Sequence, residues 1–273
     1  MSGWRTGVLD PQGPVAAAEH SILMNATLVM LAVAVVVIVA TLAFAWWFRE
    51  GNVHARRRPQ WAYSGPIEVT VWAIPVLMVM FLGGLAWIGS HQLDPQRPID
   101  APQPPLDVQV VSLDWQWLFI YPAQGIASLN RLVVPAGRPL RLRLTSASVM
   151  NSFFVPQLGS QIYTMPGMTT TLHLLAGRPG SYAGLSAQFS GDGFSDMRFD
   201  VLALSPPEFE RWQASTQAGP GRLDAARYAV LAQPAAASGP ASFGSVAPQL
   251  FESIVAAVGP VCAASAPVAR GSL

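Results

Sequence analysis

The segment from Tyr182 to Met197 has the spacing of a copper-ligand loop but few of the ligands. Ser186 and Ser190 stand four residues apart, Phe194 follows four residues later, and Met197 follows after three more. A copper pair bridged by thiolates needs two cysteines at such a spacing, with imidazole nitrogens and a weak thioether or carbonyl ligand. Serine is a hard, neutral donor and phenylalanine donates nothing. Only Met197 keeps a suitable donor, and one thioether binds no metal by itself.

The upstream position of such a site is also changed. In the run V-M-N-S-F-F-V-P from Val149 to Pro156, Asn151 stands where a sandwich domain of this kind would supply its remaining imidazole. The two loop serines have no neighbouring histidine or acid in a triad pattern, so we expect no catalytic residue on this chain. The histidines are scattered without metal-ligand spacing, and we expect surface or capping roles for each: His20, His54, His91 and His173.

Residues from about Leu9 to Trp212 resemble subunit II of the haem-copper respiratory oxidases, and within that family the cytochrome bo-type ubiquinol oxidase branch. The resemblance rests on the loop and on three further runs: D-W-Q-W-L-F-I-Y-P-A-Q-G-I-A from Asp114, V-M-N-S-F-F from Val149, and L-G-S-Q-I-Y from Leu158. Relatives that use cytochrome c carry a C-x-E-x-C-G-x-x-H-x-x-M loop. Matched by position, the changed ligands are Ser186, Gln188, Ser190 and Phe194, the upstream histidine becomes Asn151, and Gly191 and Met197 are retained.

The resemblance implies a subunit II that has lost its dinuclear copper centre. The complex would oxidise ubiquinol, reduce dioxygen to water and translocate protons. The haems, one copper and the quinol site would belong to subunit I, so this chain would carry no cofactor, and subunits III and IV would be further partners. A lipid-soluble donor arrives laterally and needs no periplasmic copper relay, which is consistent with the lost ligands.

Glu68 is the candidate functional residue, at the expected start of the second apolar segment. An acid there can simply be hydrated, or can stabilise the positive N-terminal end of its helix. Ionisable groups at membrane depth otherwise serve ion pathways. The resemblance favours the second interpretation, because subunit II glutamates at this position are implicated at a proton-channel entrance leading into subunit I.

Two uncharged stretches predict two transmembrane helices. The chain is 51% hydrophobic and 11% charged, whereas ordinary soluble proteins are about 25% charged. Residues 21–48 and 69–90 lack charge, and each exceeds the roughly 18 to 20 residues that cross a bilayer core. We expect spans at about 21–48 and 68–90, joined by a loop at 49–67 that carries most of the nearby arginines: Arg49, Arg56, Arg57 and Arg58. The positive-inside rule puts this loop in the cytoplasm and both termini in the periplasm, as expected for a multi-pass protein of a bacterial inner membrane.

The arginine cluster also has a second interpretation, as a nucleic-acid patch. A short cluster between two lipid spans is more typical of a topology anchor. The pI near 8.0 and the net charge of +1 give no general basic surface, so we expect no nucleic-acid partner.

Beyond the spans, a proline-rich linker at 92–105 leads to short strands. Alternation or aromatic enrichment marks 106–112, 115–121, 140–145, 168–175, 181–189 and 197–204. This series predicts a Greek-key sandwich at 106–204, which the resemblance sharpens to a cupredoxin fold facing the periplasm. The fold class is therefore membrane α + β: a two-helix transmembrane hairpin, a cupredoxin-like sandwich and a C-terminal helical or disordered extension.

One strand carries alternating aromatics, namely Trp115, Trp117, Phe119 and Tyr121. In relatives that use cytochrome c, such a run would include the point where electrons enter above the copper pair. Without copper the electron has nowhere to go. Alternating aromatics on a strand favour a place in the core or in an interface.

The two ends of the chain complete the predicted organisation. Residues 1–20 are expected to form a periplasmic tail, and the region 205–273 to hold a helix at about 206–218 and then a partly disordered tail draped on a partner subunit, with a weak helical segment around 249–258. Quinol oxidase subunits II commonly carry a signal peptide ending at a lipid-modified cysteine, and residues 1–20 contain neither feature. Either such a segment precedes Met1, which we favour, or the lipid anchor is absent.

Two other functions remain open from the sequence. The chain could be a membrane-anchored cupredoxin-like assembly or interaction module without an oxidase partner. It could also be a cytochrome c oxidase subunit II that holds copper through unusual ligands, although the required donors are missing.

Overall fold

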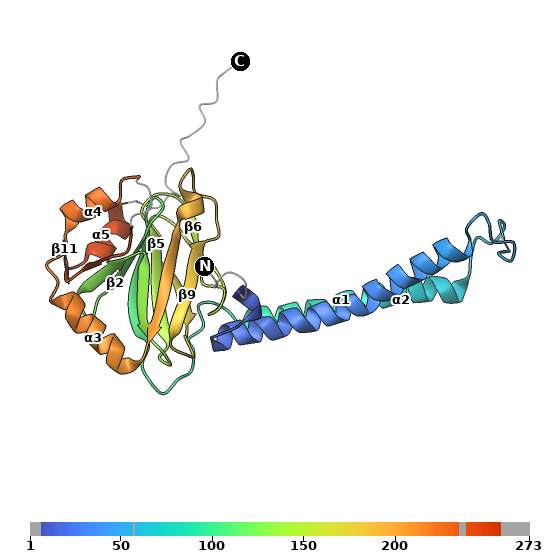
Figure 1. Ribbon diagram of the computed structural model, residues 1–273, viewed down its shortest axis with the longest axis horizontal. Helices are drawn as coiled ribbons and strands as arrows, with labels where there is room; N and C mark the ends of the chain where they lie inside the picture. The colour runs from blue at the N-terminus through green and yellow to red at the C-terminus, as the bar shows by residue number, and fades with distance from the viewer. Residues whose placement is uncertain (1–6, 57, 235–238, 258–273) are drawn as a thin grey trace, which may run out of the picture. The chain divides into compact units, whose positions relative to one another are not determined.

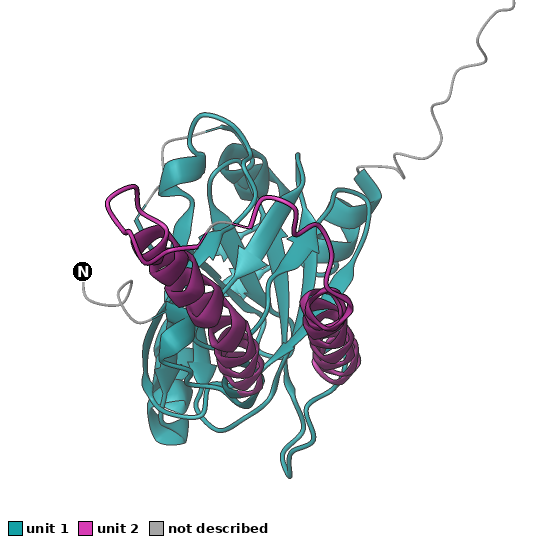
Figure 2. Cartoon of the chain, turned by 90° about the vertical axis from the view of Figure 1, so that its right-hand side faces the viewer, with its two compact units in different colours: residues 1–17, 94–273 teal, residues 18–93 magenta. Residues whose placement is uncertain are grey.

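The computed structural model describes residues 7–56, 58–234 and 239–257 of the 273-residue chain. The chain forms two compact units (Figure 2). Residues 18–93 make up a helical unit, and residues 1–17 together with 94–273 make up a unit built mainly of β-strands.

The helical unit consists of most of α1 (Pro14–Trp47) together with α2 (Gly65–Gln92). Both helices are long and apolar enough to cross a membrane, and their large side chains are mostly exposed. A helix suits this setting because it satisfies its backbone hydrogen bonds internally. The two helices meet at Gly89, where a Cβ atom would lie 2.7 Å from Ile22 Cδ1. Pro75 lies inside α2 without ending it.

Both helices begin earlier than the uncharged stretches suggest. The sequence prediction started α1 at residue 21, after the charged Glu19 and the polar His20, but the helix starts at Pro14. Proline is well suited to a first helical turn, and the following alanines are strong helix formers. Polar residues can continue a helix beyond the bilayer core, so the absence of charge marks the lipid-embedded length rather than the helix.

The larger unit is a sandwich of two sheets (Figure 1). A six-stranded sheet has the order β12-β3-β2-β1-β5-β8, and a five-stranded sheet has the order β4-β10-β9-β6-β7. Two neighbour pairs are parallel, β1 with β5 and β4 with β10, and the other pairs are antiparallel. The strands are β1 (Leu106–Ser112), β2 (Trp117–Tyr121), β3 (Ile126–Leu129), β4 (Arg131–Pro135), β5 (Leu140–Ser146), β6 (Asn151–Phe154), β7 (Ile162–Thr164), β8 (Thr170–Leu174), β9 (Gly180–Ser186), β10 (Arg198–Leu204) and β12 (Ala241–Phe243). The predicted β-sandwich is therefore confirmed.

The main core of this unit is aromatic. Trp117 and Phe119 are fully buried, and their rings lie 5.3 to 6.4 Å from those of Phe153 and Phe199. Tyr121 shares this core. The expectation that alternating aromatics fill a core is thus correct for these three residues of β2.

The other face of the six-stranded sheet is covered by the C-terminal region, at the left of Figure 1. This region, which we call the C-terminal cover, contains α3 (Pro206–Gln217), β11 (Arg222–Leu223), α4 (Ala225–Leu231), β12, β13 (Ser245–Val246) and α5 (Leu250–Ala257). Of these, β12 is itself the edge strand of the six-stranded sheet, and α3 reaches the main core through Phe209. A second buried cluster joins Leu118 and Ile120 of β2 to Phe243, Phe251 and Ile254 of the cover. Each such buried side chain contributes about 1.5–3 kcal/mol.

The expectation of a partly disordered region after Gly219 is therefore wrong for residues 219–234 and 239–249, whereas the predicted helical segment at about 249–258 is confirmed by α5. Its alanine, proline, glycine and serine content suggested too little apolar surface to fold. A few widely spaced apolar side chains are enough, because the sheet supplies the partner surface. The segment 258–273 lies outside the described residues.

An N-terminal strap, residues 10–17, is bound to the sandwich. The backbone N–H of Gln12 donates to the carbonyl of Gln157 at 2.8 Å, and its own carbonyl accepts from the N–H of Gly177 at 2.8 Å. A Cβ at Gly13 would overlap the carbonyl oxygen of Leu175, so the close approach requires glycine. The strap belongs to the same compact unit as the sandwich.

Candidate functional site

The ends of three strands bring together positions that the resemblance matches to copper ligands, which we call the former ligand positions. Ser186 ends β9, Asn151 begins β6, and these two strands are neighbours in the five-stranded sheet. Met197 directly precedes β10, the other neighbour of β9, and its carbonyl accepts from the N–H of Ser186 at 3.2 Å. Residues that lie far apart in the sequence therefore meet at one end of the sandwich.

Hydrogen bonds join these side chains to one another. The buried hydroxyl of Ser186 lies 3.1 Å from Asn151 Oδ1 and 3.3 Å from the backbone carbonyl of Gln188. The Asn151 amide nitrogen donates to the carbonyl of Val149 at 3.3 Å. The Ser190 hydroxyl lies 3.9 Å from the sulfur of Met197, which is itself buried.

Trp115 holds the loop from the side. Its indole N–H donates to the Ser190 carbonyl at 3.2 Å, and a Cβ at Gly193 would overlap the indole ring. Trp115 has φ of 68°, a left-handed conformation that is rare outside glycine, asparagine and aspartate. The sequence placed Trp115 in the strand with the other aromatics, but β2 begins at Trp117. The sequence showed only the alternation of aromatic residues, which suggested a strand. The left-handed turn at Trp115 could not be predicted, because no glycine marks it.

Phe194 has a packing role in the loop. It begins a 3-10 turn, η2 (Phe194–Asp196), and its ring packs edge-on against Phe189 with 5.6 Å between ring centroids. Gly191, in the same loop, has φ of 110° and so needs the conformational freedom of glycine.

The available donors do not suit a thiolate-bridged copper pair. Two hydroxyls, one amide oxygen, one backbone carbonyl and one thioether meet here, and no thiolate or imidazole is among them. The hydroxyl of Ser186 is already bonded to its neighbours. Across the described residues, no group of three or more histidine, cysteine, aspartate or glutamate side chains is placed to hold a metal ion. The arrangement supports a polar, hydrogen-bonded loop.

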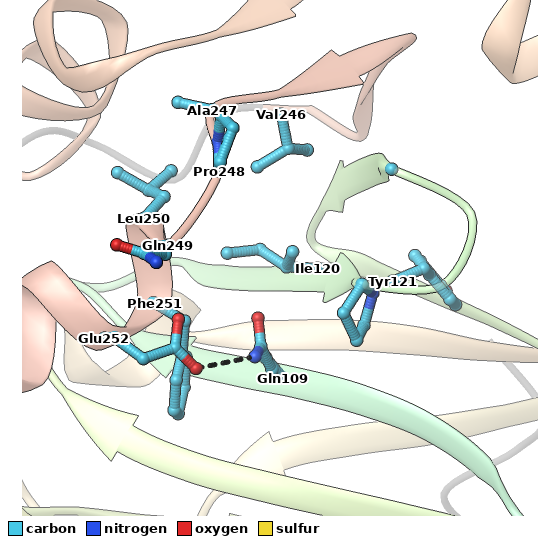
Figure 3. Close-up of a pocket in the computed structure, with 12 residues that line it drawn as sticks. Gln109, Ile120, Tyr121, Val246, Ala247, Pro248, Gln249, Leu250, Phe251 and Glu252 are labelled. Carbon is cyan, nitrogen blue, oxygen red and sulfur yellow. Dashed lines mark hydrogen bonds between the residues drawn. The ribbon is translucent and has the colours of Figure 1, made fainter.

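A separate cavity of about 440 Å³ lies between the C-terminal cover and the six-stranded sheet (Figure 3). Apolar walls come from Ile120, Val246 and Leu250. Two of its polar side chains already bond within the chain: the Gln109 amide donates to Glu252 at 3.3 Å, and the Arg143 guanidinium lies 3.5 Å from the same carboxylate. We interpret this cavity as a packing gap between the C-terminal cover and the sheet, not as a ligand site.

Glu68 belongs to the helical unit, whereas this loop belongs to the sandwich unit. Glu68 occupies the first turn of α2, its side chain is exposed, and its N–H bonds the carbonyl of Ser64 at 2.9 Å. A carboxylate there is favourable next to the helix N-terminus. Both interpretations of Glu68 therefore remain as the sequence left them. The expectation for His173 was wrong, because it is only 7% exposed within β8.

The comparisons with known proteins agree with this architecture. The family described as cytochrome c oxidase subunit II, periplasmic domain, matches residues 108–203, and the COX aromatic rich motif matches residues 217–258. Two apolar helices followed by this matched sandwich define a protein of the respiratory-oxidase subunit II class, and they fit a protein of the inner membrane.

Three relatives narrow that class. Cytochrome bo(3) ubiquinol oxidase subunit 2 of Pseudomonas aeruginosa is 46% identical over 255 residues, which cover 93% of this chain and 77% of that protein. Ubiquinol oxidase subunit 2 of Acetobacter aceti is 46% identical over 259 residues, covering 94% and 84%. Quinol oxidase subunit 2 of Bacillus cereus is 33% identical over 232 residues, covering 84% and 79%. The chain belongs to the ubiquinol oxidase subunit 2 family.

Proposed function

We propose that this chain is the copper-free subunit II of a proton-translocating ubiquinol oxidase, in which it has no redox centre of its own. The complex oxidises ubiquinol in the membrane and reduces dioxygen to water. The observation that carries this proposal is the similarity to ubiquinol oxidase subunits 2 along 93% of the chain. The set of hydroxyl, amide and thioether groups at the former ligand positions supports it, since these groups bond one another.

The remaining cofactors and partners follow from this assignment. Haems and one copper belong to subunit I, which also takes the ubiquinol, and subunits III and IV complete the complex. The apolar faces of α1 and α2 support this proposal, because most of their large side chains are exposed among the described residues. We place them against lipid and partner helices.

We also propose that both chain termini lie in the periplasm and that the loop 49–64 lies in the cytoplasm. The strap at the start of α1 is bonded to the sandwich that follows α2. This contact supports placing both ends of the helix pair on one side of the membrane. The arginine-rich loop, which includes Arg49 and Arg56, supports the cytoplasm as the opposite side.

The donor preference and the metal content test the function. The purified complex is expected to consume oxygen with ubiquinol and not with reduced cytochrome c, and to hold one copper per complex. A second copper that disappears when Ser186 and Ser190 are replaced by alanine would refute the copper-free assignment. Purification of the chain without any haem-bearing subunit would refute the oxidase assignment and favour a free-standing interaction module.

Glu68→Ala tests the proton-uptake role. We expect turnover to fall severalfold while assembly and haem content stay unchanged, because the carboxylate would no longer pass protons toward subunit I. Glu50→Ala is the matched control, since Glu50 is an exposed acid near the end of α1. Equal turnover in the two variants would leave only the helix-capping interpretation of Glu68.

A further inference from the structure

The end of the helical unit at which α1 passes into α2 exposes a group of aromatic side chains. Loop 49–64 makes this connection (Figure 1). Five aromatic side chains next to or within the loop are 48% to 73% exposed. We name these five residues the aromatic belt: Trp46, Trp47, Phe48, Trp61 and Tyr63. Tryptophan and tyrosine gather where membrane hydrocarbon meets water, so the belt marks this end of the helix pair as a membrane boundary.

The loop beside the belt is basic. Residues 48–64 contain four arginines and one acid, Glu50. Three of these arginines, Arg49, Arg56 and Arg58, are exposed. Both ion pairs found among the described residues lie in the sandwich unit, so neither of them neutralises this loop. A guanidinium binds phosphate or carboxylate oxygens through two parallel hydrogen bonds, and these three groups are placed to receive such a ligand.

Arg49 joins the aromatic and the basic parts of this end. Its guanidinium carbon lies 4.9 Å from the centre of the Trp46 ring, and one nitrogen donates to the Trp46 carbonyl at 3.4 Å. The Asn52 amide donates to the next carbonyl, that of Trp47, at 2.6 Å. Side chains thus satisfy two of the last carbonyls of α1. The other N–H groups of Arg49 can bind a ligand at the level of the indole.

We propose that this end of the helix pair binds anionic phospholipids, whose phosphates contact Arg49, Arg56 and Arg58 while the aromatic belt lies among the headgroups. Basic segments next to a transmembrane helix are attracted to anionic lipids in this way. The inference goes beyond the proposed function, because it needs the two spans but no partner subunit.

A lipid layer fits this surface better than an acidic face of a partner protein. Successive residues of a helix are rotated by about 100°, so Phe44, Trp46 and Trp47 point in different directions around α1. Their side chains are 64%, 64% and 48% exposed. A partner protein would cover one side of the helix, whereas lipid surrounds it.

Cross-linking with photoreactive lipids in native membranes tests the contact. Membranes that hold the full complex are supplied with phosphatidylglycerol or phosphatidylcholine carrying a diazirine in the headgroup, and the labelled peptides are mapped by mass spectrometry. Phosphatidylglycerol is expected to label loop 49–64 severalfold more than phosphatidylcholine, which has no net charge. Equal labelling by both lipids would overturn the proposal, and so would labelling that an excess of inorganic phosphate abolishes.

A charge-removing variant tests the role of the arginines. Each arginine near an anionic surface strengthens binding about fivefold, so Arg56→Gln with Arg58→Gln should lower phosphatidylglycerol labelling of the loop on the order of tenfold. The variant keeps the other two arginines of the loop, which preserve the orientation of the helices. Arg222→Gln with Arg227→Gln is the control, because it removes the same charge from exposed positions of the C-terminal cover. Unchanged labelling in the first variant, or an equal loss in both, would contradict the inference.

A benzophenone amino acid at position 53 separates lipid from protein as the neighbour. Val53 is 91% exposed within the loop. Cross-links to lipid are expected, whereas cross-links mainly to another subunit would assign this surface to a protein partner and overturn the proposal. These assays read lipid contact and need no oxidase activity, so their failure is separate from a failure of the proposed function.

Discussion

Replacing Tyr121 by phenylalanine should weaken the sandwich measurably, because its hydroxyl joins the two sheets. Tyr121 is fully buried at the end of β2. Its hydroxyl donates to the Val133 carbonyl at 2.9 Å and accepts from the Val133 N–H at 2.8 Å. Val133 lies on β4, the edge strand of the opposite sheet. The phenol therefore satisfies both backbone groups of an edge residue.

The expected loss follows from these two bonds. Phenylalanine would leave a buried N–H and a buried C=O without that partner, and each costs about 1–3 kcal/mol. Partial relaxation of the edge strand puts the sum at about 2–4 kcal/mol. In a unit of this size the midpoint of thermal unfolding should fall by about 5–15 °C. Near-ultraviolet circular dichroism of the full chain in detergent would follow the transition.

Alkaline pH gives an independent measurement of the same group. Burial raises the pKa of Tyr121 above its ordinary value of 10.0. In the unfolded chain the phenol ionises near that ordinary value, so its stabilising contribution is complete below pH 10 and declines as the pH rises toward the folded pKa. The decline approaches about 1.4 kcal/mol per pH unit. Burial also raises the pKa of Tyr228 to about 12, but Tyr228 is partly exposed and should contribute less.

An exposed tyrosine provides the control for Tyr121→Phe. Tyr163→Phe removes a hydroxyl from a side chain that is 44% exposed, and should leave the unfolding midpoint nearly unchanged. The Tyr121→Phe variant should show a shallower loss of stability above pH 10 than the wild type. A change below about 0.5 kcal/mol, the range of ordinary surface substitutions, together with an unchanged alkaline slope, would refute the proposed link between the sheets.

Two further substitutions test the strap and the former ligand loop. Gly13→Ala should release the strap, because the added Cβ would overlap the backbone of the sandwich. Hydrogen exchange at residues 10–17 should then rise. Gly51→Ala is the control and should leave this exchange unchanged, because Gly51 has open space around it. Ser186→Ala should destabilise the chain by about 1–2 kcal/mol in chemical denaturation, because a buried hydrogen bond to Asn151 is lost. The exposed Ser195→Ala is its control, and an equal effect of both serines would exclude a special role for the loop network.

Much of the architecture is encoded in short stretches of sequence. The two uncharged stretches identify both helices, because a bilayer demands a continuous apolar length. Period-two alternation identifies several strands, such as residues 140–145 within β5. The changed ligand positions come from the family resemblance and stay a prediction, although the structure does bring Asn151 and Ser186 together. The helices and strands depend on neighbours in the chain and need no knowledge of the tertiary contacts.

The features that the sequence did not predict all depend on distant contacts. The C-terminal cover folds because Phe243, Phe251 and Ile254 find an apolar sheet face, and composition alone cannot report that face. The strap is held by backbone bonds to residues 157 and 177, which leave no side-chain pattern. The left-handed turn at Trp115 is fixed by the loop that its indole contacts. In each case tertiary context overrides local preference.

The former ligand loop depends both on local sequence and on distant contacts. Its shape can therefore be kept without metal ligands. A metal would join the strand ends of β6, β9 and β10 through its ligands. Here two side-chain contacts join the same strand ends: Ser186 bonds Asn151, and Ser190 contacts Met197. The indole of Trp115 against Gly193 adds a contact that needs no metal. These contacts hold the loop in its geometry through the chain's own side chains. The loop should therefore tolerate changes at exposed Ser195 far better than changes at buried Ser186.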